Sequence, residues 1–134
     1  MNGRFLLDTN FIIDLLANRS HATDFISKTS EAFVPIISFA ELFYGAYKSK
    51  QKEQNIRETE RIYTQYPSVG ITWETTQIFG RIKARLKELG RPIPDHDIWI
   101  AALAEQNELT LVTRDMDFRH VEGLDVTFLA PNPL

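Results

Sequence analysis

Short apolar runs alternate along this chain with segments whose apolar side chains recur at helical spacing. Residues 5–7 form the first run, and the apolar positions from Phe11 to Leu16 then follow helical periodicity. Residues 32–37 form a second run, which is again followed by a helical stripe from Phe39 to Ala46. Strands that are joined by helices must cross over the sheet, and such right-handed crossovers give a parallel sheet with helices on both faces. The pattern therefore predicts an α/β fold.

The alternation continues through the rest of the chain. The charged segment 48–66 has a weaker periodicity and predicts a partly exposed helix that ends at Pro67. Residues 74–89 predict the clearest amphipathic helix, because one apolar stripe runs from Ile78 through Leu86 to Leu89 and Gly90 provides a stop. Residues 98–103 predict a buried helix with Asp95 as its cap. The remaining strands are predicted at residues 69–73, 109–112 and 126–129.

Length and composition limit the classes to which the chain can belong. With 134 residues, 43% of them hydrophobic, it can bury one core, and we interpret residues 1–134 as a single domain. No apolar run approaches the roughly 20 residues that cross a bilayer, and no secretion signal opens the sequence. The lack of cysteine excludes disulfides, thiolate zinc sites and a cysteine nucleophile. These features predict a soluble protein of the reducing cytoplasm.

Four acidic residues fall where this fold would bring strand ends together. Asp8 directly follows the first strand, and Glu41 lies in the first turn of the helix after the second. Asp97 opens the helix that leads into the fourth strand, and Asp115 comes two residues after that strand, with Asp117 close behind. In open parallel sheets, ligands bind in the crevice outside the carboxyl ends of the strands. We therefore expect these carboxylates to converge on one crevice.

Each acid also has a purely structural explanation. Ser38 and Glu41 have the spacing of a capping box, in which the glutamate would only return a hydrogen bond to the serine backbone. Asp97 suits the positive end of a helix dipole, while Asp8 and Asp115 suit turns. Taken singly, each structural reading is the stronger one. Taken together they weaken, because carboxylates that share a crevice repel one another unless a cation lies between them.

The chemistry of the donors indicates which cation is expected. Carboxylate oxygens without cysteine or paired histidines select hard ions such as Mg²⁺ or Mn²⁺ over zinc. The histidines, His21, His96 and His120, are far apart in sequence, and we assign them no chemistry. The formal net charge of −3 argues against a nucleic-acid partner, but two divalent cations would cancel four of the acids locally. Magnesium usually takes one or two carboxylates and completes its shell with water and substrate phosphate.

Four short motifs then resemble those of PIN domains. The segment LLDTN at residues 6–10 resembles the opening motif, and AEL at residues 40–42, followed by Gly45, resembles the second. DIWIAA at residues 97–102 is similar to the third, and LVTRD at residues 111–115, with Asp117-Phe118 after it, is similar to the fourth. Their order and spacing run from residue 5 to about residue 129 and most resemble VapC-type toxins of toxin-antitoxin pairs.

This resemblance implies a three-layer fold with sheet order 3-2-1-4-5, a homodimer, and an endoribonuclease that depends on Mg²⁺ or Mn²⁺. It implies inhibition by a small cognate antitoxin protein. It also selects Asp97 over Asp95, and Asp115 over Asp117, as ligands beside Asp8 and Glu41, with Asp117 as a possible helper. Thr9 and Thr113 are further candidate helpers that would orient water, although a hydroxyl beside a strand end can equally be a local cap.

The expected reaction is attack on an RNA phosphodiester by metal-activated water, in line with the leaving oxygen. An aspartyl-phosphate phosphatase also places an aspartate after its first strand, but it needs a second acid two residues later, and position 10 is Asn. A PIN nuclease of RNA processing and a catalytically silent acidic binding module remain alternatives. The basic positions Arg81, Lys83, Arg85 and Lys87 would line an RNA path or simply form a solvated helix face.

Overall fold

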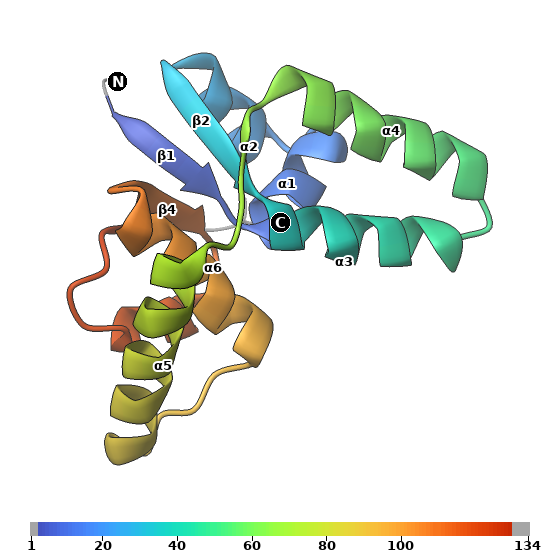
Figure 1. Cartoon of the computed structure of the whole chain (residues 1–134). Coiled ribbons are helices and arrows are strands. Elements are labelled where there is room, and N and C mark those ends of the chain that lie inside the picture. Colours follow the sequence, from blue (N-terminus) through green and yellow to red (C-terminus); the bar gives the residue numbers. More distant parts are fainter. Residues whose placement is uncertain (1–2, 130–134) are drawn as a thin grey trace.

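A five-stranded parallel sheet lies at the centre of the structure, a computed structural model that describes residues 3–129 (Figure 1). The strand order is β3-β2-β1-β4-β5, and every pair of neighbours is parallel. In the register, Leu6 of the central strand lies opposite Phe33 on one side and Leu111 on the other. The predicted α/β fold and its sheet order are confirmed. The strands are β1 (Arg4–Leu7), β2 (Glu31–Pro35), β3 (Ser68–Val69), β4 (Thr110–Thr113) and β5 (Val126–Phe128).

Helices cover both faces of this sheet. Leu6 packs with α5 and α6, whereas its neighbours Phe5 and Leu7 pack with α1, α3 and α4 on the opposite face. This alternation follows from the pleat of a strand, and burial on both faces explains why the strands are continuous apolar runs. The helices are α1 (Thr9–Leu16), α2 (Ser20–Ser27), α3 (Ile36–Tyr47), α4 (Lys52–Gln65), α5 (Trp73–Glu88) and α6 (Asp95–Gln106), with a 3₁₀ turn η1 at Met116–His120.

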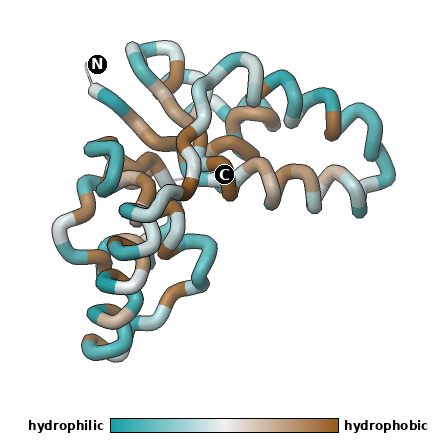
Figure 2. Tube along the Cα trace, viewed as in Figure 1, coloured by the Kyte–Doolittle hydropathy of each residue, from teal (hydrophilic) through white to brown (hydrophobic). Residues whose placement is uncertain are grey.

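Two arms extend from the sheet in diverging directions (Figure 1). The hairpin of α3 and α4 forms one arm, and the paired helices α5 and α6 form the other. Hydrophobic residues concentrate along the strands and on the inward sides of the helices, while the outer side of α4 is largely hydrophilic (Figure 2). Gly90 ends α5 with φ at +66°, and the Arg91 amide donates to the Leu86 carbonyl, as in a Schellman motif. No helix within residues 3–129 has the length and apolar character that crossing a membrane requires.

Several element boundaries differ from the sequence-based expectation. The second strand ends at Pro35, and Ile36 and Ile37 begin α3, because Pro35 suits the cap position of a helix but cannot donate to a strand ladder. Similarly, β3 contains only Ser68–Val69, and Trp73 already belongs to α5. The helix α2 was not predicted, although Ala22, Phe25 and Ile26 have helical spacing and pack in the core.

Two assignments of single residues in the helices were also wrong. Asp95 does not cap α6, because Pro94 occupies the cap position and Asp95 is the first helical residue. Its carboxylate pairs instead with Lys83 of α5, at 2.9 Å. Leu89 does not belong to the buried stripe of α5, since it is 41% exposed and lies just beyond the last helical residue.

Candidate active site

A small pocket lies beyond the carboxyl ends of β1 and β4. Its volume is about 210 Å³, and four segments that are distant in sequence each contribute one acid to it. The sheet order explains this convergence, because β1 and β4 are neighbours whose carboxyl ends point the same way. The pocket is lined by Asp8, Thr9, Asn10, Ile13, Glu41, His96, Asp97 and Asp115. The structure therefore brings together the four acids that the sequence singled out.

Asp8 is buried at the floor of this pocket, with only 3% of its surface exposed. Its Oδ1 accepts a hydrogen bond from the Thr9 amide at 2.8 Å, so Asp8 does cap α1. Its Oδ2 accepts from the Thr113 hydroxyl at 2.7 Å. Burial raises the pKa of Asp8 above its ordinary value, and the charges of Glu41 and Asp115 add to this, whereas the two hydrogen bonds act in the opposite direction. Asp8 therefore both caps α1 and lines the pocket.

Glu41 is held by a side chain from a different segment. The Thr9 hydroxyl donates to its Oε1 at 2.7 Å, and Ser38 Oγ lies 2.8 Å from the same hydroxyl. The capping-box explanation is wrong, because α3 begins at Ile36 and Ser38 is buried inside the helix. Glu41 consequently lies in the second turn of α3 rather than the first. Its carboxylate faces the pocket for a reason other than helix capping.

Asp97 combines burial with charge. It lies in the first turn of α6, as expected, and is 8% exposed. Burial is the main reason why the pKa of Asp97 is raised to about 6; His96 lowers it, while the negative charges of Asp8, Asp115 and Glu41 raise it further. The helix dipole alone would favour the charged form. The raised pKa of Asp97 therefore reflects its burial first and the neighbouring carboxylates second.

The structure separates the two pairs of neighbouring acids that the sequence left ambiguous. Asp115 lines the pocket, whereas the exposed side chain of Asp117 does not. The Asp117 amide donates to Asp115 Oδ1 at 2.9 Å and so helps to orient that carboxylate. Asp97 likewise lines the pocket, whereas Asp95 points to Lys83. Asp97 and Asp115 are thus the members of each pair that line the pocket, and their role as ligands stays a prediction.

Thr113 connects three parts of the site. Its hydroxyl donates to Asp8 and accepts from the Asp115 amide at 3.0 Å and from Asn10 Nδ2 at 3.3 Å. Thr9 similarly reaches Glu41, 32 positions along the chain. Neither hydroxyl is only a local cap. Both threonines hold carboxylates in place rather than pointing freely into the pocket.

His96 was missed by the sequence analysis. Its Nε2 lies 3.3 Å from Asp97 Oδ1 and 3.5 Å from Glu41 Oε2, at the rim of the pocket. Its position directly before Asp97 was a usable signal, because two residues of one helical turn can both reach a site at the helix start. The spacing between the three histidines carries no such signal, because they are far apart in sequence.

A second polar cluster, around Asp14 of α1, lies next to the segment that carries Asp115, and it was also not predicted. Asp14 is buried in α1, and its Oδ2 accepts from His21 Nε2 and from Arg114 Nε, both at 2.9 Å. Arg19 approaches the other oxygen at 3.6 Å. Because Arg114 lies between Thr113 and Asp115, this cluster anchors the loop that carries part of the pocket.

The donor set suits a hard divalent cation. The pocket offers carboxylate, hydroxyl and amide oxygens, which Mg²⁺ and Mn²⁺ prefer. Across the described residues, no three His, Asp or Glu side chains are placed so that they could hold a metal ion by themselves. Magnesium retains waters and takes substrate phosphate oxygens as further ligands, so it needs only one or two carboxylates from the protein. The chemistry of these oxygen donors therefore fits such an ion, with water and substrate completing its shell.

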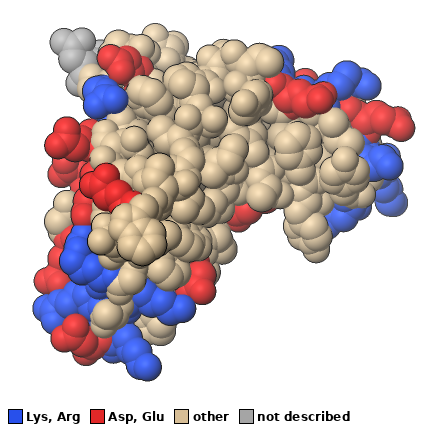
Figure 3. Space-filling model, in the orientation of Figure 1, with Lys and Arg blue, Asp and Glu red and all other residues tan. Residues whose placement is uncertain are grey.

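The basic face of α5 is largely neutralised by acids. Arg81 pairs with Glu105, Lys83 with Asp95, and Arg85 with Glu122. Figure 3 shows this interleaving of blue and red over the lower part of α5. The pairs favour the solvated-face interpretation over an RNA path.

Fold and pocket together define an α/β protein with carboxylates gathered at the carboxyl edge of a 3-2-1-4-5 parallel sheet. The family model described as "PIN domain" matches residues 5–124. Ribonuclease VapC1 of Haemophilus influenzae strain R2866 is 33% identical over 129 residues, which cover 90% of this chain and 93% of that protein. The chain therefore belongs to the PIN-domain family and, within it, to the VapC group.

Two further comparisons agree with this assignment. The tRNA(fMet)-specific endonuclease VapC of Salmonella typhimurium is 29% identical, and the match covers 92% of this chain and 96% of that protein. A chain of the DNA-bound VapBC crystal structure from Salmonella typhimurium superposes with a TM-score of 0.85 and 28% identity. That match covers 93% of this chain and 97% of the other.

Proposed function

We propose that this chain is an endoribonuclease that uses Mg²⁺ or Mn²⁺ to hydrolyse RNA phosphodiester bonds, and that it is the toxin of a toxin-antitoxin pair. The observation that carries the proposal is the convergence of Asp8, Glu41, Asp97 and Asp115 on one pocket in a member of the VapC group. Relatives across nearly the full length of the chain are named ribonucleases, which supports the reaction class.

Asp8, Asp97 and Asp115 would hold the cation, with Glu41 as a further ligand or as the group that orients water. When bound, such an ion neutralises phosphate charge and makes a water molecule more acidic. The protein supplies the positions: Thr113 fixes Asp8, and Thr9 fixes Glu41. Fixed carboxylates need no reorganisation during the reaction, which is how enzymes lower the barrier for phosphoryl chemistry.

His96 lies at the rim of the pocket, where its Nε2 contacts carboxylate oxygens of Asp97 and Glu41. A bound cation would compete with the imidazole for the same oxygens.

The partner we propose is a small antitoxin that presents an arginine or lysine to Asp8, Glu41 and Asp97. Solved VapBC complexes among the similar structures support a partner of this kind. A concave acidic pocket attracts a basic side chain for the same electrostatic reason that it attracts a metal ion. We further propose that the toxin is a homodimer. A purified complex that cleaves RNA as fast as the free chain would contradict inhibition at the pocket.

The test is a cleavage assay on the purified chain without its partner. Initiator tRNA, ribosomal RNA and a messenger RNA should be incubated with Mg²⁺, with Mn²⁺ and with a chelator. We expect cleavage of at least one RNA with metal and none with chelator, and Asp8→Asn should lose it. No cleavage of any RNA by the metal-loaded parent would favour the alternative of a catalytically silent binding module.

A further inference from the structure

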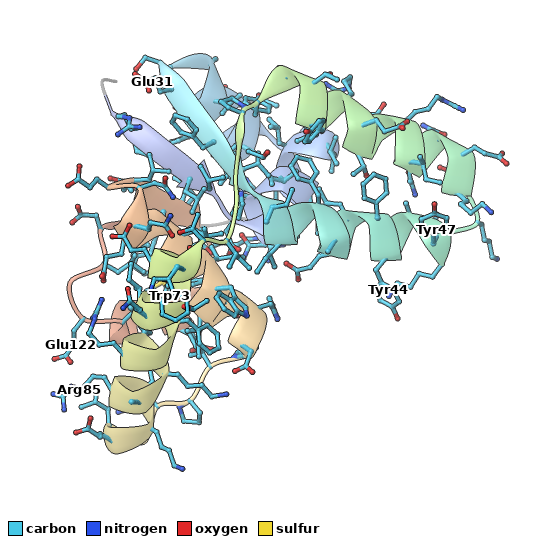
Figure 4. The ribbon with its side chains drawn as sticks, in the orientation of Figure 1. Glu31, Tyr44, Tyr47, Trp73, Arg85 and Glu122 are labelled. Carbon is cyan, nitrogen blue, oxygen red and sulfur yellow. The ribbon has the colours of Figure 1, made fainter. Side chains whose placement is uncertain are left out.

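The outer half of α3 presents an unusual surface next to the pocket. Glu41, Tyr44 and Lys48 are spaced at i, i+3 and i+7, so they share one face of the helix. Tyr44 is 67% exposed, and its side chain points away from α4 (Figure 4). Aromatic side chains usually stabilise a protein by burying their surface, but most of the Tyr44 ring is left in solvent. The face that carries Glu41 thus continues outward as an exposed aromatic surface.

Positive charge accompanies this aromatic surface. Lys48 Nζ lies 4.7 Å from the centre of the Tyr44 ring, and Lys52 Nζ lies 5.8 Å from that of Tyr47, which is 63% exposed. Lys50 adds a third ammonium group within the same turn. Figure 3 shows basic residues at the free end of this hairpin, with acidic residues among them.

These lysines differ from the cations of α5. In residues 3–129, none of the three has a carboxylate within ion-pair distance, whereas three of the four basic side chains of α5 do. The charge at the end of the α3–α4 hairpin is therefore available to an anion from outside the chain. A ring flanked by an uncompensated ammonium group matches a nucleotide, which offers a base to stack and a phosphate to neutralise.

We propose that Tyr44 and Lys48 form a subsite for single-stranded RNA that leads the strand to the pocket, an inference that rests on the proposed ribonuclease activity. Tyr44 stacks on a base, and Lys48 contacts the adjoining phosphate. At 1.5 Å of rise per residue, Tyr44 lies about 5 Å and Lys48 about 10 Å along α3 from Glu41. The subsite is thus within reach of nucleotides beside the scissile bond. It selects unpaired RNA because a base inside a duplex is already stacked between its neighbours and leaves no face for the ring.

A protein partner is offered a different surface of the same hairpin. Between α3 and α4 lies an apolar groove of about 420 Å³, which neither Tyr44 nor Lys48 lines. An apolar segment would gain more from that groove than from an exposed ring beside an ammonium group. The groove is lined by Ile36, Phe39, Phe43, Glu60, Tyr63 and Thr64.

The experiment measures RNA affinity and cleavage separately. A fluorescein-labelled single-stranded RNA that the parent cleaves is titrated by anisotropy against Asp97→Asn protein, with and without Tyr44→Ala. We expect Tyr44→Ala to weaken binding about 10-fold. Tyr44→Phe keeps the ring, so in the same background its RNA affinity should lie within about twofold of that of Asp97→Asn alone. Lys48→Gln should weaken binding and make the slope of log K against log salt shallower by about 0.7.

Lys87→Gln is the matched control for charge, because it removes an unpaired lysine from α5 on the other arm, and it should change neither affinity nor slope. In the otherwise unaltered protein, Tyr44→Ala should raise KM with little effect on kcat. The parent can cleave RNA while Tyr44→Ala and Lys48→Gln, each in the Asp97→Asn background, bind RNA as tightly as Asp97→Asn alone. That result overturns the subsite but not the proposed function. Loss of antitoxin binding with unchanged RNA affinity also overturns it and assigns this face to the protein partner. A parent that cleaves no RNA overturns both proposals.

Discussion

The carboxylate of Asp97 is under opposing demands. Burial and the charges of Asp8, Glu41 and Asp115 favour its neutral form, whereas His96 favours the ionised one. An acid that only stabilises a helix start would be expected in an environment that favours its ionised form, because the helix dipole stabilises negative charge there. The strain is explained if a cation occupies the pocket in the working state, since it reverses the balance in favour of the carboxylate.

Replacing Asp97 by Asn removes one charge at nearly constant shape. We expect Asp97→Asn to abolish RNA cleavage and to leave the metal-free protein as stable as the parent or more stable by about 1 kcal/mol. Urea unfolding without metal, run beside the cleavage assay, measures both effects. Asp95→Asn is the matched control, because this exposed acid pairs with Lys83 outside the pocket, and it should cleave within about twofold of the parent. Unchanged cleavage by Asp97→Asn would rule out our site assignment.

The raised pKa of Asp97 also predicts how stability depends on pH. The folded protein holds this proton with a pKa of about 6, against an ordinary value of 3.8, so it binds more protons than the unfolded chain between those values. The free energy of unfolding must then rise as pH falls through about 6 toward 4, until general acid unfolding begins. Metal-free melts at pH 7.5, 6.5 and 5.5 should show an increasing melting temperature. In Asp97→Asn this increase should be clearly smaller, and an identical pH response in both proteins would contradict the predicted titration.

At the scale of elements, the sequence predicted the alternation of strands and helices but not all of their ends. Hydrophobic periodicity located five strands and the helices that carry Glu41 and Asp97. It misplaced the start of α3 because Ile36 and Ile37 extend an apolar run whatever their backbone conformation, and only Pro35 marked the change. It missed α2, a short helix in which polar residues outnumber the apolar ones.

The support behind the pocket could not be predicted from sequence for a different reason. Asp14 meets His21 from the neighbouring helix and Arg114 from 100 positions away, and no local pattern encodes such a contact. The positions of Asp8 and Asp115 were predictable because strand order alone brings their segments together. His96 falls between these cases. Its place next to Asp97 in the sequence could have indicated that it lies near the pocket, but no motif of its own marks it.

The cluster around Asp14 should contribute strongly to stability. Its side chain is 6% exposed, and its removal would leave His21 and Arg114 without their shared acceptor. We expect Asp14→Ala to lower the free energy of unfolding by about 2 kcal/mol, because the largely buried His21 and the partly exposed Arg114 lose the oxygen to which both donate. Cleavage should also fall, since Arg114 anchors the loop of Asp115. Arg19→Ala removes an exposed partner at 3.6 Å and should cost less than about 1 kcal/mol; equal losses in the two variants would contradict this view.

At the scale of the whole molecule, charge is distributed unevenly between the two arms. The basic side chains of α5 mostly meet acids, while those at the end of the α3–α4 hairpin meet aromatic rings. The net charge of −3 is therefore a poor guide to partners, because several of the acids are committed to the pocket and to α5. Local arrangement, which composition cannot express, decides where an anionic strand can approach.

Binding of a divalent ion should connect the pocket to the stability of the whole fold. The acids that repel one another without metal are gathered only when the chain is folded, so an ion that binds them binds the native state in preference to the unfolded one. At 100 times its dissociation constant such an ion adds about 2.7 kcal/mol, which corresponds to a rise of several degrees in melting temperature for a chain of this size. Thermal melts across a Mg²⁺ series should show this rise in the parent and in Asp117→Asn, whose side chain lies outside the pocket. Asp8→Asn loses the most buried acid of the pocket and should show little or no rise. A parent whose melting temperature ignores both Mg²⁺ and Mn²⁺ would remove the physical reason for gathering these carboxylates.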